Sequence, residues 1–369
     1  MSSVERVPLF VVGSSGLLAG ELLRLAAEHP SLRVAGIVSR EPGRALAELH
    51  PHLAGLALGA GARATIDQAA ATRAIRSAVE EGDGAPVAVA LGLPHGAAAD
   101  AWRALRSELG DAARSVRVVD LSADYRLRSK DAYARWYGKP HGDADELDAF
   151  AYGLPELARE ELRGAARIAA PGCFATALQL AAWPAARAGL LNADEPWRFS
   201  AVTGSSGSGV TPTATTHHPF RDGNMRAYGL GGHRHEAELS QTLAGLDLAP
   251  EICFLPHSGP FARGIHMTAM LPLTDAARGI GAESARAIFA DAFEGAPFVR
   301  VEAGAPELRS VVGSNSAAIG VFPRDRTLVV LVTLDNMIKG GSGQALQALN
   351  LALGLPEALG LPRHGLGVV

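Results

Sequence analysis

Runs of apolar residues alternate with helix-like segments through the first part of the chain. The apolar runs lie at 7–12, 32–38, 87–91 and 116–121. Between the first two runs, residues 17–29 place apolar side chains at helical spacing, so these segments predict a strand, a helix and a second strand in that order. An alanine-rich helix is expected after the third run. We therefore predict a parallel, doubly wound sheet up to about residue 125.

Beyond about residue 155 the pattern becomes mixed. We predict helices at 173–183 and 343–353, a long Gly/Ser/Thr-rich loop at 204–223, and strands near 198–203, 252–256, 265–272 and 328–334. Such a pattern is typical of an α+β domain built on a largely antiparallel sheet. We therefore expect two domains with a boundary near residue 165, each large enough to bury its own core.

Composition narrows the class of protein. The chain has 369 residues, is 48% hydrophobic and 20% charged, and carries a formal net charge of -4, so nothing in it favours binding to nucleic acid. No apolar run reaches the roughly 18 residues of a membrane span, and we expect a cytoplasmic protein. The two cysteines, Cys173 and Cys253, are too few for a disulfide scaffold and lack Cys-x-x-Cys spacing.

The segment Gly13-Ser14-Ser15-Gly16 lies where the first predicted strand turns into a helix. Its glycines let backbone N–H groups approach a pyrophosphate at the positive end of that helix, although the motif departs from G-x-G-x-x-G and a purely steric turn is the alternative. The second strand ends in Ser39-Arg40 instead of an acid, which favours the 2′-phosphate of NADP unless Arg40 is only a solvated loop residue. Leu93 and Pro94, after the third strand, predict a second loop along the cofactor.

Cys173 begins the helix predicted at 173–183, directly after Pro171 and Gly172. A cysteine attacks as thiolate, and a helix N-terminus stabilises a thiolate through its dipole and its unpaired N–H groups. Cys173 is therefore a candidate nucleophile, with a small buried apolar residue as the alternative. Cys253 has apolar neighbours, and we expect it in a strand core without chemistry.

The segment His233-Arg234-His235 combines proton donors with a fixed cation. This combination suits a reaction that makes an oxyanion and then protonates it, and His217-His218 is the rival pair. Alternating histidines also bind metals, but no third ligand has suitable spacing, so we expect no metal site.

Other residues suit an anionic ligand. Arg126 and Arg263 each offer a guanidinium fork for a carboxylate or phosphate, and membership of a surface ion pair is the equally open alternative. Residues 203–209, which include Ser206 and Gly207, offer N–H groups and hydroxyls to a phosphate, with a flexible linker as the alternative.

Seven motifs, in one order along nearly the whole chain, resemble the N-acetyl-gamma-glutamyl-phosphate reductase family. They are Gly13-Ser14-Ser15-Gly16, Asp120-Leu121-Ser122-Ala123-Asp124-Tyr125-Arg126-Leu127-Arg128, Tyr152-Gly153-Leu154-Pro155-Glu156, Pro171-Gly172-Cys173, the Ser/Gly loop, Gly232-His233-Arg234-His235, and Leu334-Asp335-Asn336-Met337-Ile338-Lys339-Gly340. No single motif is decisive, but seven in order are specific.

The resemblance implies an α/β fold of the glyceraldehyde-3-phosphate dehydrogenase-like type, also found in aspartate-semialdehyde dehydrogenase. A Rossmann NADP-binding domain would comprise residues 1–165 and a returning C-terminal helix at 336–369. An α+β catalytic and oligomerisation domain would comprise 166–335. The implied reaction is the NADPH-dependent reduction of N-acetyl-gamma-glutamyl phosphate to the 5-semialdehyde through a cysteine thioester, in arginine biosynthesis, by a homodimer or homotetramer.

The resemblance also implies a role for each candidate residue. The nucleophile maps onto Cys173 and the catalytic histidine onto His233 or His235, where we favour His233 without a strong physical reason. The expected cofactor contacts are Gly13, Ser14, Ser15, Gly16, Ser39, Arg40, Leu93, Pro94, Ser206, Gly207 and Asn336, the last of them near the nicotinamide. The expected substrate contacts are Ser122, Asp124, Arg126, Arg234 and Arg263.

The chain departs from the family pattern at two places. Phe174 and Ala175 replace the Tyr and Pro that usually follow the cysteine, and Leu17 stands where an aromatic residue is usual. Four alternatives therefore stay open: the same chemistry on an N-succinyl-glutamyl or aminoadipyl phosphate, aspartate-semialdehyde dehydrogenase, a cofactor-free Cys/His acyltransferase, and a nucleotide-sensing regulator.

Overall fold

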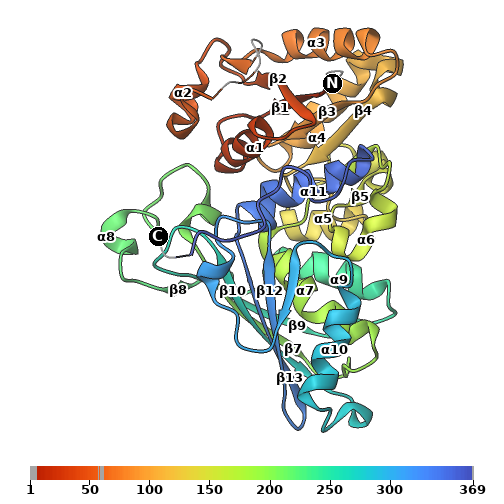
Figure 1. Ribbon diagram of the computed structural model, residues 1–369, viewed down its shortest axis with the longest axis vertical. Coiled ribbons are helices and arrows are strands. Elements are labelled where there is room, and N and C mark those ends of the chain that lie inside the picture. The colour runs from red at the N-terminus through yellow and green to blue at the C-terminus, as the bar shows by residue number, and fades with distance from the viewer. Residues whose placement is uncertain (1–5, 57, 59–61, 368–369) are drawn as a thin grey trace. The chain divides into compact units, whose positions relative to one another are not determined.

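The computed structural model describes residues 6–56, 58 and 62–367, which form two compact units (Figure 1). The first unit runs to Pro171 and includes Gly341–Leu361, and the second comprises Gly172–Gly340 and the segment from Pro362 onwards. The sequence analysis placed all of 336–369 with the first domain, whereas the structure groups only part of that segment with it. Among the described residues, no helix is both long and apolar enough to cross a membrane.

The first unit contains a six-stranded parallel sheet. Its strands are β1 (Val7–Val12), β2 (Leu32–Val38), β3 (Val87–Leu91), β4 (Val116–Asp120), β5 (Ala151–Tyr152) and β6 (Arg167–Ala169), in the order β2-β1-β3-β4-β6-β5. The four apolar runs that predicted strands became β1 to β4. The strands are apolar on both faces because both faces are covered by helices.

Helices pack on both faces of this sheet. They are α1 (Leu17–Ala27), α3 (Gln68–Glu81), α4 (Ala97–Leu109), α5 (Lys130–Tyr137), α6 (Pro155–Leu162) and α11 (Gly343–Ala352), with the short α2 (Leu46–Leu49) beside them. Ile75 of α3 and Trp102 of α4 share one buried cluster with Val89 and Val118 of the sheet. Helices α1 and α11 contact strands from their own side, which gives the predicted doubly wound arrangement.

The second unit contains a seven-stranded mixed sheet. Its strands are β7 (Trp197–Thr203), β8 (Arg226–Ala227), β9 (Ile252–Ser258), β10 (Ile265–Pro272), β11 (Val299–Glu302), β12 (Ala317–Pro323) and β13 (Thr327–Leu334), in the order β11-β12-β13-β10-β7-β9-β8. Strands β12, β13, β10 and β7 are antiparallel to their neighbours in that series, as predicted, while β7 pairs with β9 in parallel.

Helices cover one face of the seven-stranded sheet. They are α7 (Cys173–Arg187), α9 (His235–Ala244) and α10 (Ala282–Ala292), and the short α8 (His218–Arg221) lies away from them (Figure 1). Phe199 and Ala269 stand opposite each other on the covered face and are buried.

The other face of this sheet carries exposed side chains. The strand register places Arg198 beside both Cys253 and Met270, and all three side chains are exposed. We call this side the open face and define it by Arg198, Cys253, Leu255 and Met270. The expectation that Cys253 lies in a strand core was wrong, because its side chain points to this face.

Candidate active site

Cys173 is the first residue of α7, as predicted. Gly172 caps the helix in an extended conformation, and its carbonyl oxygen accepts the backbone N–H of Thr176 at 2.9 Å. Cys173 is half-buried. An added Cβ at Gly340 would lie 2.7 Å from the Cβ of Cys173, so the backbone that follows β13 is in close contact with the cysteine. The helix start and this turn together fix the position of the thiol.

His235 lies against the residue that precedes Cys173. An added Cβ at Gly172 would lie 2.3 Å from His235 Nε2, so only glycine allows the imidazole to approach this closely. Glu238, whose side chain is fully buried, accepts the backbone N–H of Gly172 through Oε2 at 3.0 Å. Its other oxygen, Oε1, lies 4.0 Å from His235 Nε2. The imidazole, the carboxylate and the cysteine turn therefore form one cluster.

His233 belongs to the same cluster but has a different environment. Its ring centroid lies 4.6 Å from that of His235, and its backbone N–H donates to Glu236 Oε1 at 3.0 Å. Burial lowers the pKa of His233 to about 4, and the positive charge of Arg234 contributes to the lowering. His233 is therefore neutral at physiological pH.

Tyr228 is a candidate that the sequence analysis missed. Its ring centroid lies 6.1 Å from that of His233. Burial raises the pKa of Tyr228 far above its usual value, and the negative charge of the Cys173 thiolate raises it further, against the influence of Arg234. The hydroxyl therefore stays protonated close to the cysteine. Its position five residues before His233 gives no helical or strand periodicity that could have indicated this contact.

Ser206, Gly207 and Asn336 lie together in the second unit. Asn336 Nδ2 donates to Ser206 Oγ at 3.0 Å, while its Oδ1 accepts the backbone N–H of Gly264 at 2.7 Å. An added Cβ at Gly207 would lie 3.9 Å from Asn336 Nδ2. The amide of Asn336 is thus held in one orientation, with the small residues of η5 (Ser205–Ser208) beside it.

Arg263 is paired with a carboxylate. Its Nε donates to Asp335 Oδ2 and its Nη2 to Asp335 Oδ1, each at 3.1 Å. Asp335 is fully buried and also accepts the backbone N–H groups of Gly313, Met337 and Ile338. The ion-pair alternative for Arg263 therefore has direct geometric support, and its contact with substrate stays a prediction. Because Asn336 follows Asp335 directly, this ion pair also fixes the backbone on which the amide stands.

The glycine loop of the first unit has the features expected of a dinucleotide site. Gly13 has φ +86°, and an added Cβ would lie 2.8 Å from the backbone of Gly92, so this position requires glycine. No atom lies within 4 Å of an added Cβ at Gly16, the N-cap of α1. Ser14 Oγ is buried and has no hydrogen-bond partner among the described residues. A buried hydroxyl without a partner, beside open space at a helix N-terminus, fits a bound pyrophosphate.

The residues after β2 also fit the prediction of a phosphate contact. Arg40 is exposed. Glu41, which could oppose it, forms an ion pair with Arg44 at 3.0 Å, and the N–H of Glu41 donates to Ser39 Oγ at 3.1 Å. Leu93, predicted to line the cofactor, lies at the turn where β1 and β3 end, since its Cδ2 is 2.8 Å from an added Cβ at Gly13.

Ser122, Asp124 and Arg126 lie together in the first unit, and all three are buried. Asp124 accepts the backbone N–H groups of Gly96 and Ala99 at 2.6 and 3.0 Å, so it caps the N-terminus of α4. Arg126 Nε donates to the carbonyl oxygen of Ala170 at 2.8 Å. These contacts show a supporting role for the turn, and its contact with substrate stays a prediction.

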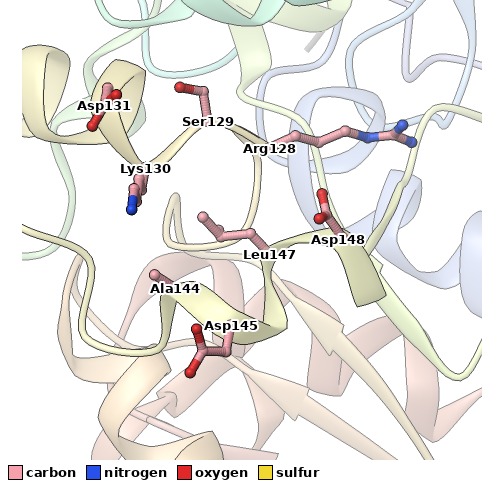
Figure 2. A pocket seen from close by; sticks show the side chains of 8 residues that line it. All are labelled: Arg128, Ser129, Lys130, Asp131, Ala144, Asp145, Leu147 and Asp148. Carbon is pink, nitrogen blue, oxygen red and sulfur yellow. The ribbon is translucent and has the colours of Figure 1, made fainter.

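The first unit also has an open hollow of about 540 Å³ (Figure 2). It is lined by Arg128, Ser129, Lys130, Asp131, Ala144, Asp145, Leu147 and Asp148. None of the candidate residues described above lines it, so it is separate from the candidate site. Within the described part of the chain, no group of three or more His, Cys, Asp or Glu side chains could hold a metal ion.

The fold and the cysteine cluster define a class of protein. Residues 9–165 match the family model of the semialdehyde dehydrogenase NAD binding domain, and residues 173–336 match that of the semialdehyde dehydrogenase dimerisation domain. The first unit is thus an NAD(P)-binding domain, and the chain is of the semialdehyde dehydrogenase class. The predicted two-domain α/β fold is confirmed.

Comparison with individual proteins narrows this class. The N-acetyl-gamma-glutamyl-phosphate reductase of Pseudomonas fluorescens is 39% identical, over 98% of this chain and 99% of the relative. That of Pseudomonas aeruginosa is 41% identical, over 96% and 98%. The chain belongs to the N-acetyl-gamma-glutamyl-phosphate reductase family, which confirms the resemblance found in the motifs.

Solved structures show the same fold at low identity. Aspartate semialdehyde dehydrogenase II from Vibrio cholerae, complexed with ASA, has a TM-score of 0.62 at 16% identity, over 95% of this chain and 99% of that one. The aspartate semialdehyde dehydrogenase from Candida albicans, with NADP, has a TM-score of 0.59 at 12% identity, over 95% and 99%.

Proposed function

We propose that this chain catalyses the NADPH-dependent reduction of N-acetyl-gamma-glutamyl phosphate to N-acetyl-glutamate 5-semialdehyde and phosphate, a step of arginine biosynthesis. The observation that carries the proposal is Cys173 at the start of α7, with His235 and Glu238 packed against the residue before it. The names of the relatives at about 40% identity support the same substrate.

Cys173 is the nucleophile in this proposal. Its thiolate attacks the acyl carbonyl carbon, the bond from carbon to the phosphate oxygen breaks, and phosphate leaves with the electron pair to give a thioester. NADPH, when bound, supplies the hydride that reduces the acyl group. Collapse of the resulting thiohemiacetal releases the aldehyde and returns the thiolate to Cys173.

We assign the proton transfers to His235, in place of the initial preference for His233. Glu238 Oε1 lies 4.0 Å from His235 Nε2 and favours a protonated imidazole there, whereas burial keeps His233 neutral. His235 donates its proton to the oxyanion of the thiohemiacetal and takes it back when the carbon–sulfur bond breaks. Arg234 is the fixed positive charge next to both histidines.

The coenzyme is proposed to be NADP. Ser14, Ser15 and Gly16 would hold the pyrophosphate, Ser39 and Arg40 the 2′-phosphate, and Asn336 the nicotinamide, with Ser206 orienting the Asn336 amide. We expect Arg40→Ala to raise KM for NADPH at least about tenfold and to leave KM for NADH nearly unchanged, because only NADPH carries the phosphate. Equal effects on both coenzymes would overturn this assignment.

We propose a homodimer that forms through the open face, and a homotetramer would need a further contact. Exposed Leu255 and Met270 lie on this face, in the part of the chain that matches a dimerisation domain. Cys253 provides a native probe, since peptide mapping after alkylation should show it protected at high protein concentration and reactive on dilution. We place the protein in the cytoplasm, where a free thiol at Cys173 persists.

The decisive experiment compares substrates in the phosphate-dependent reverse reaction. N-acetyl-glutamate 5-semialdehyde should give the highest kcat/KM among the N-acetyl, N-succinyl, aminoadipyl and aspartate semialdehydes. A higher value for the N-succinyl or aminoadipyl compound would instead assign a different acyl substrate, consistent with the unusual Phe174 and Ala175. Cys173→Ser should bind NADPH normally and lose nearly all turnover, and retained turnover would refute the proposed nucleophile.

A further inference from the structure

Large exposed apolar side chains are concentrated in one segment of the second unit. Residues 209–232, which we call the arm, connect η5 to His233 and include α8 and β8. In the described part of the chain seven large apolar side chains are exposed, and four of them belong to the arm: Val210 at 57%, Phe220 at 65%, Met225 at 56% and Leu230 at 71%. Two more, Leu255 and Met270, are on the open face. A concentration of this kind marks a contact surface, whereas single exposed apolar residues do not.

The arm is attached to the edge of the seven-stranded sheet. The guanidinium of Arg221 in α8 donates to Ser258 Oγ and to the carbonyl oxygens of Gly259 and Phe261, the last at 3.2 Å. Phe220, the residue before Arg221, is at the same time 65% exposed. The anchored arginine thus holds a short helix in a position where its neighbouring phenylalanine faces solvent.

A second attachment lies further along the arm. Strand β8 pairs with β9 in antiparallel register, and the N–H of Tyr228 donates to the carbonyl oxygen of Pro256 at 3.1 Å. Since β8 is the last strand of the sheet that carries the open face, the arm and the open face form one continuous surface beside β9.

From this continuity we propose that the arm packs against a second copy of this chain and extends the dimer interface beyond the open face. Apolar side chains on a continuous surface are buried together when an identical partner covers it, because the contact repeats on both subunits. The inference rests on the homodimer proposed above and adds a segment which that proposal does not include.

Burial of the arm has a consequence for catalysis. One end of the arm follows Ser206 and Gly207, and the other end contains Tyr228 and leads directly into His233. The chain segments that carry the amide-orienting serine and the two histidines are therefore both continuous with the arm. Contact with a partner restricts both ends, so the dimer should turn over substrate faster than the monomer.

The test is the double variant Phe220→Ser/Leu230→Ser, with Leu366→Ser as the matched control. Leu366 is 63% exposed and lies outside both the arm and the open face. Sedimentation equilibrium should show at least about a tenfold rise in the dimer dissociation constant for the double variant, because aromatic and leucine anchors contribute strongly to interfaces. The control should match the wild type. Circular dichroism and thermal melting would verify that both variants fold.

The kinetic readout is the dependence of kcat on protein concentration. The double variant should lose kcat at concentrations where the wild type is still a dimer, and should regain it when concentrated. An unchanged dissociation constant would overturn the arm proposal. So would a raised KM at every concentration with an unchanged dissociation constant, because the arm would then act as a lid on its own subunit.

A third variant separates this inference from the proposed dimer. Met270→Arg places a charge on the open face and leaves the arm intact. If Met270→Arg dissociates the dimer while the arm variant does not, only the arm proposal fails. If the wild type is monomeric at all concentrations, the proposed dimer fails and the arm proposal fails with it, while the reductase activity is tested independently by the substrate comparison.

Discussion

Glu238 accepts the backbone N–H of Gly172 at 3.0 Å, across 66 positions of sequence, and so fixes the residue directly before Cys173. The same carboxylate faces the imidazole of His235. Glu238 is therefore a positioning residue for both partners of the proposed reaction. A fully buried carboxylate is costly unless it is paired, which explains why its two oxygens face a donor and a histidine.

We expect Glu238→Gln to lower kcat by about 10- to 100-fold, the range for loss of one charge-assisted contact. Glutamine keeps the size of the side chain and can still accept the Gly172 N–H, but it has no charge to support a protonated His235. KM should change less than kcat. The control is Glu236→Gln, the same substitution at a carboxylate that accepts only the His233 N–H among its printed contacts. Equal kcat in both variants would contradict the proposed role of Glu238.

The two histidines should differ in their effect on turnover. We expect His235→Asn to reduce kcat by about 10²- to 10⁴-fold, as for the loss of a general acid, and His233→Asn to reduce it less than about tenfold. Steady-state kinetics at saturating NADPH, with coenzyme binding measured by fluorescence, separates turnover from binding. The reverse order of effects would return the proton-transfer role to His233.

His233 should also make stability depend on pH. Its pKa is about 4 in the folded chain, below the value of about 6.5 expected in the unfolded chain. Between these values the unfolded state binds more protons, so the free energy of unfolding falls as pH is lowered from about 6.5 to about 4. His233→Asn should show a smaller fall over this window in urea unfolding. Asp120, with a pKa raised to about 6 by burial and by Asp124, acts in the opposite direction in both proteins, so the difference between them isolates His233.

Local patterns in the sequence were sufficient to predict many of the elements. The apolar runs of β1 to β4 and the helix that begins at Cys173 were predicted correctly, because strand formation and helix start depend on neighbouring residues. The exposure of Cys253 was predicted wrongly. Its apolar neighbours indicate a strand, but the face that a side chain occupies depends on strand register and on which face the helices cover.

Contacts between distant residues could not be predicted in the same way. Arg263 and Asp335 are 72 positions apart, and either could have contacted substrate until the fold paired them. The role of Glu238 depends on its distance from Gly172, which the sequence does not contain. Tyr228 was missed for the same reason, since its place near the cysteine follows from the pairing of β8 with β9.

Gly340→Ala should displace Cys173 without removing any catalytic group. The added Cβ would lie 2.7 Å from Cys173 Cβ and 3.1 Å from its Cα, and at that separation one of the two backbones must move. The N–H of Gly340 donates to the carbonyl oxygen of Asp335 at 2.8 Å, so the turn itself resists movement and the helix start shifts instead. We expect kcat to fall at least about tenfold, since small misplacements of a reacting group are costly. The cost in stability should be about 1–3 kcal/mol, as for overpacking.

The matched control for this substitution is Gly304→Ala, because an added Cβ at Gly304 has no atom within 4 Å. It should retain the activity and stability of the wild type. The rate of Cys173 alkylation, followed by mass spectrometry, reports the position of the thiol independently of turnover and should change only in Gly340→Ala. If Gly340→Ala shows the wild-type alkylation rate and kcat, the turn after β13 does not position the nucleophile.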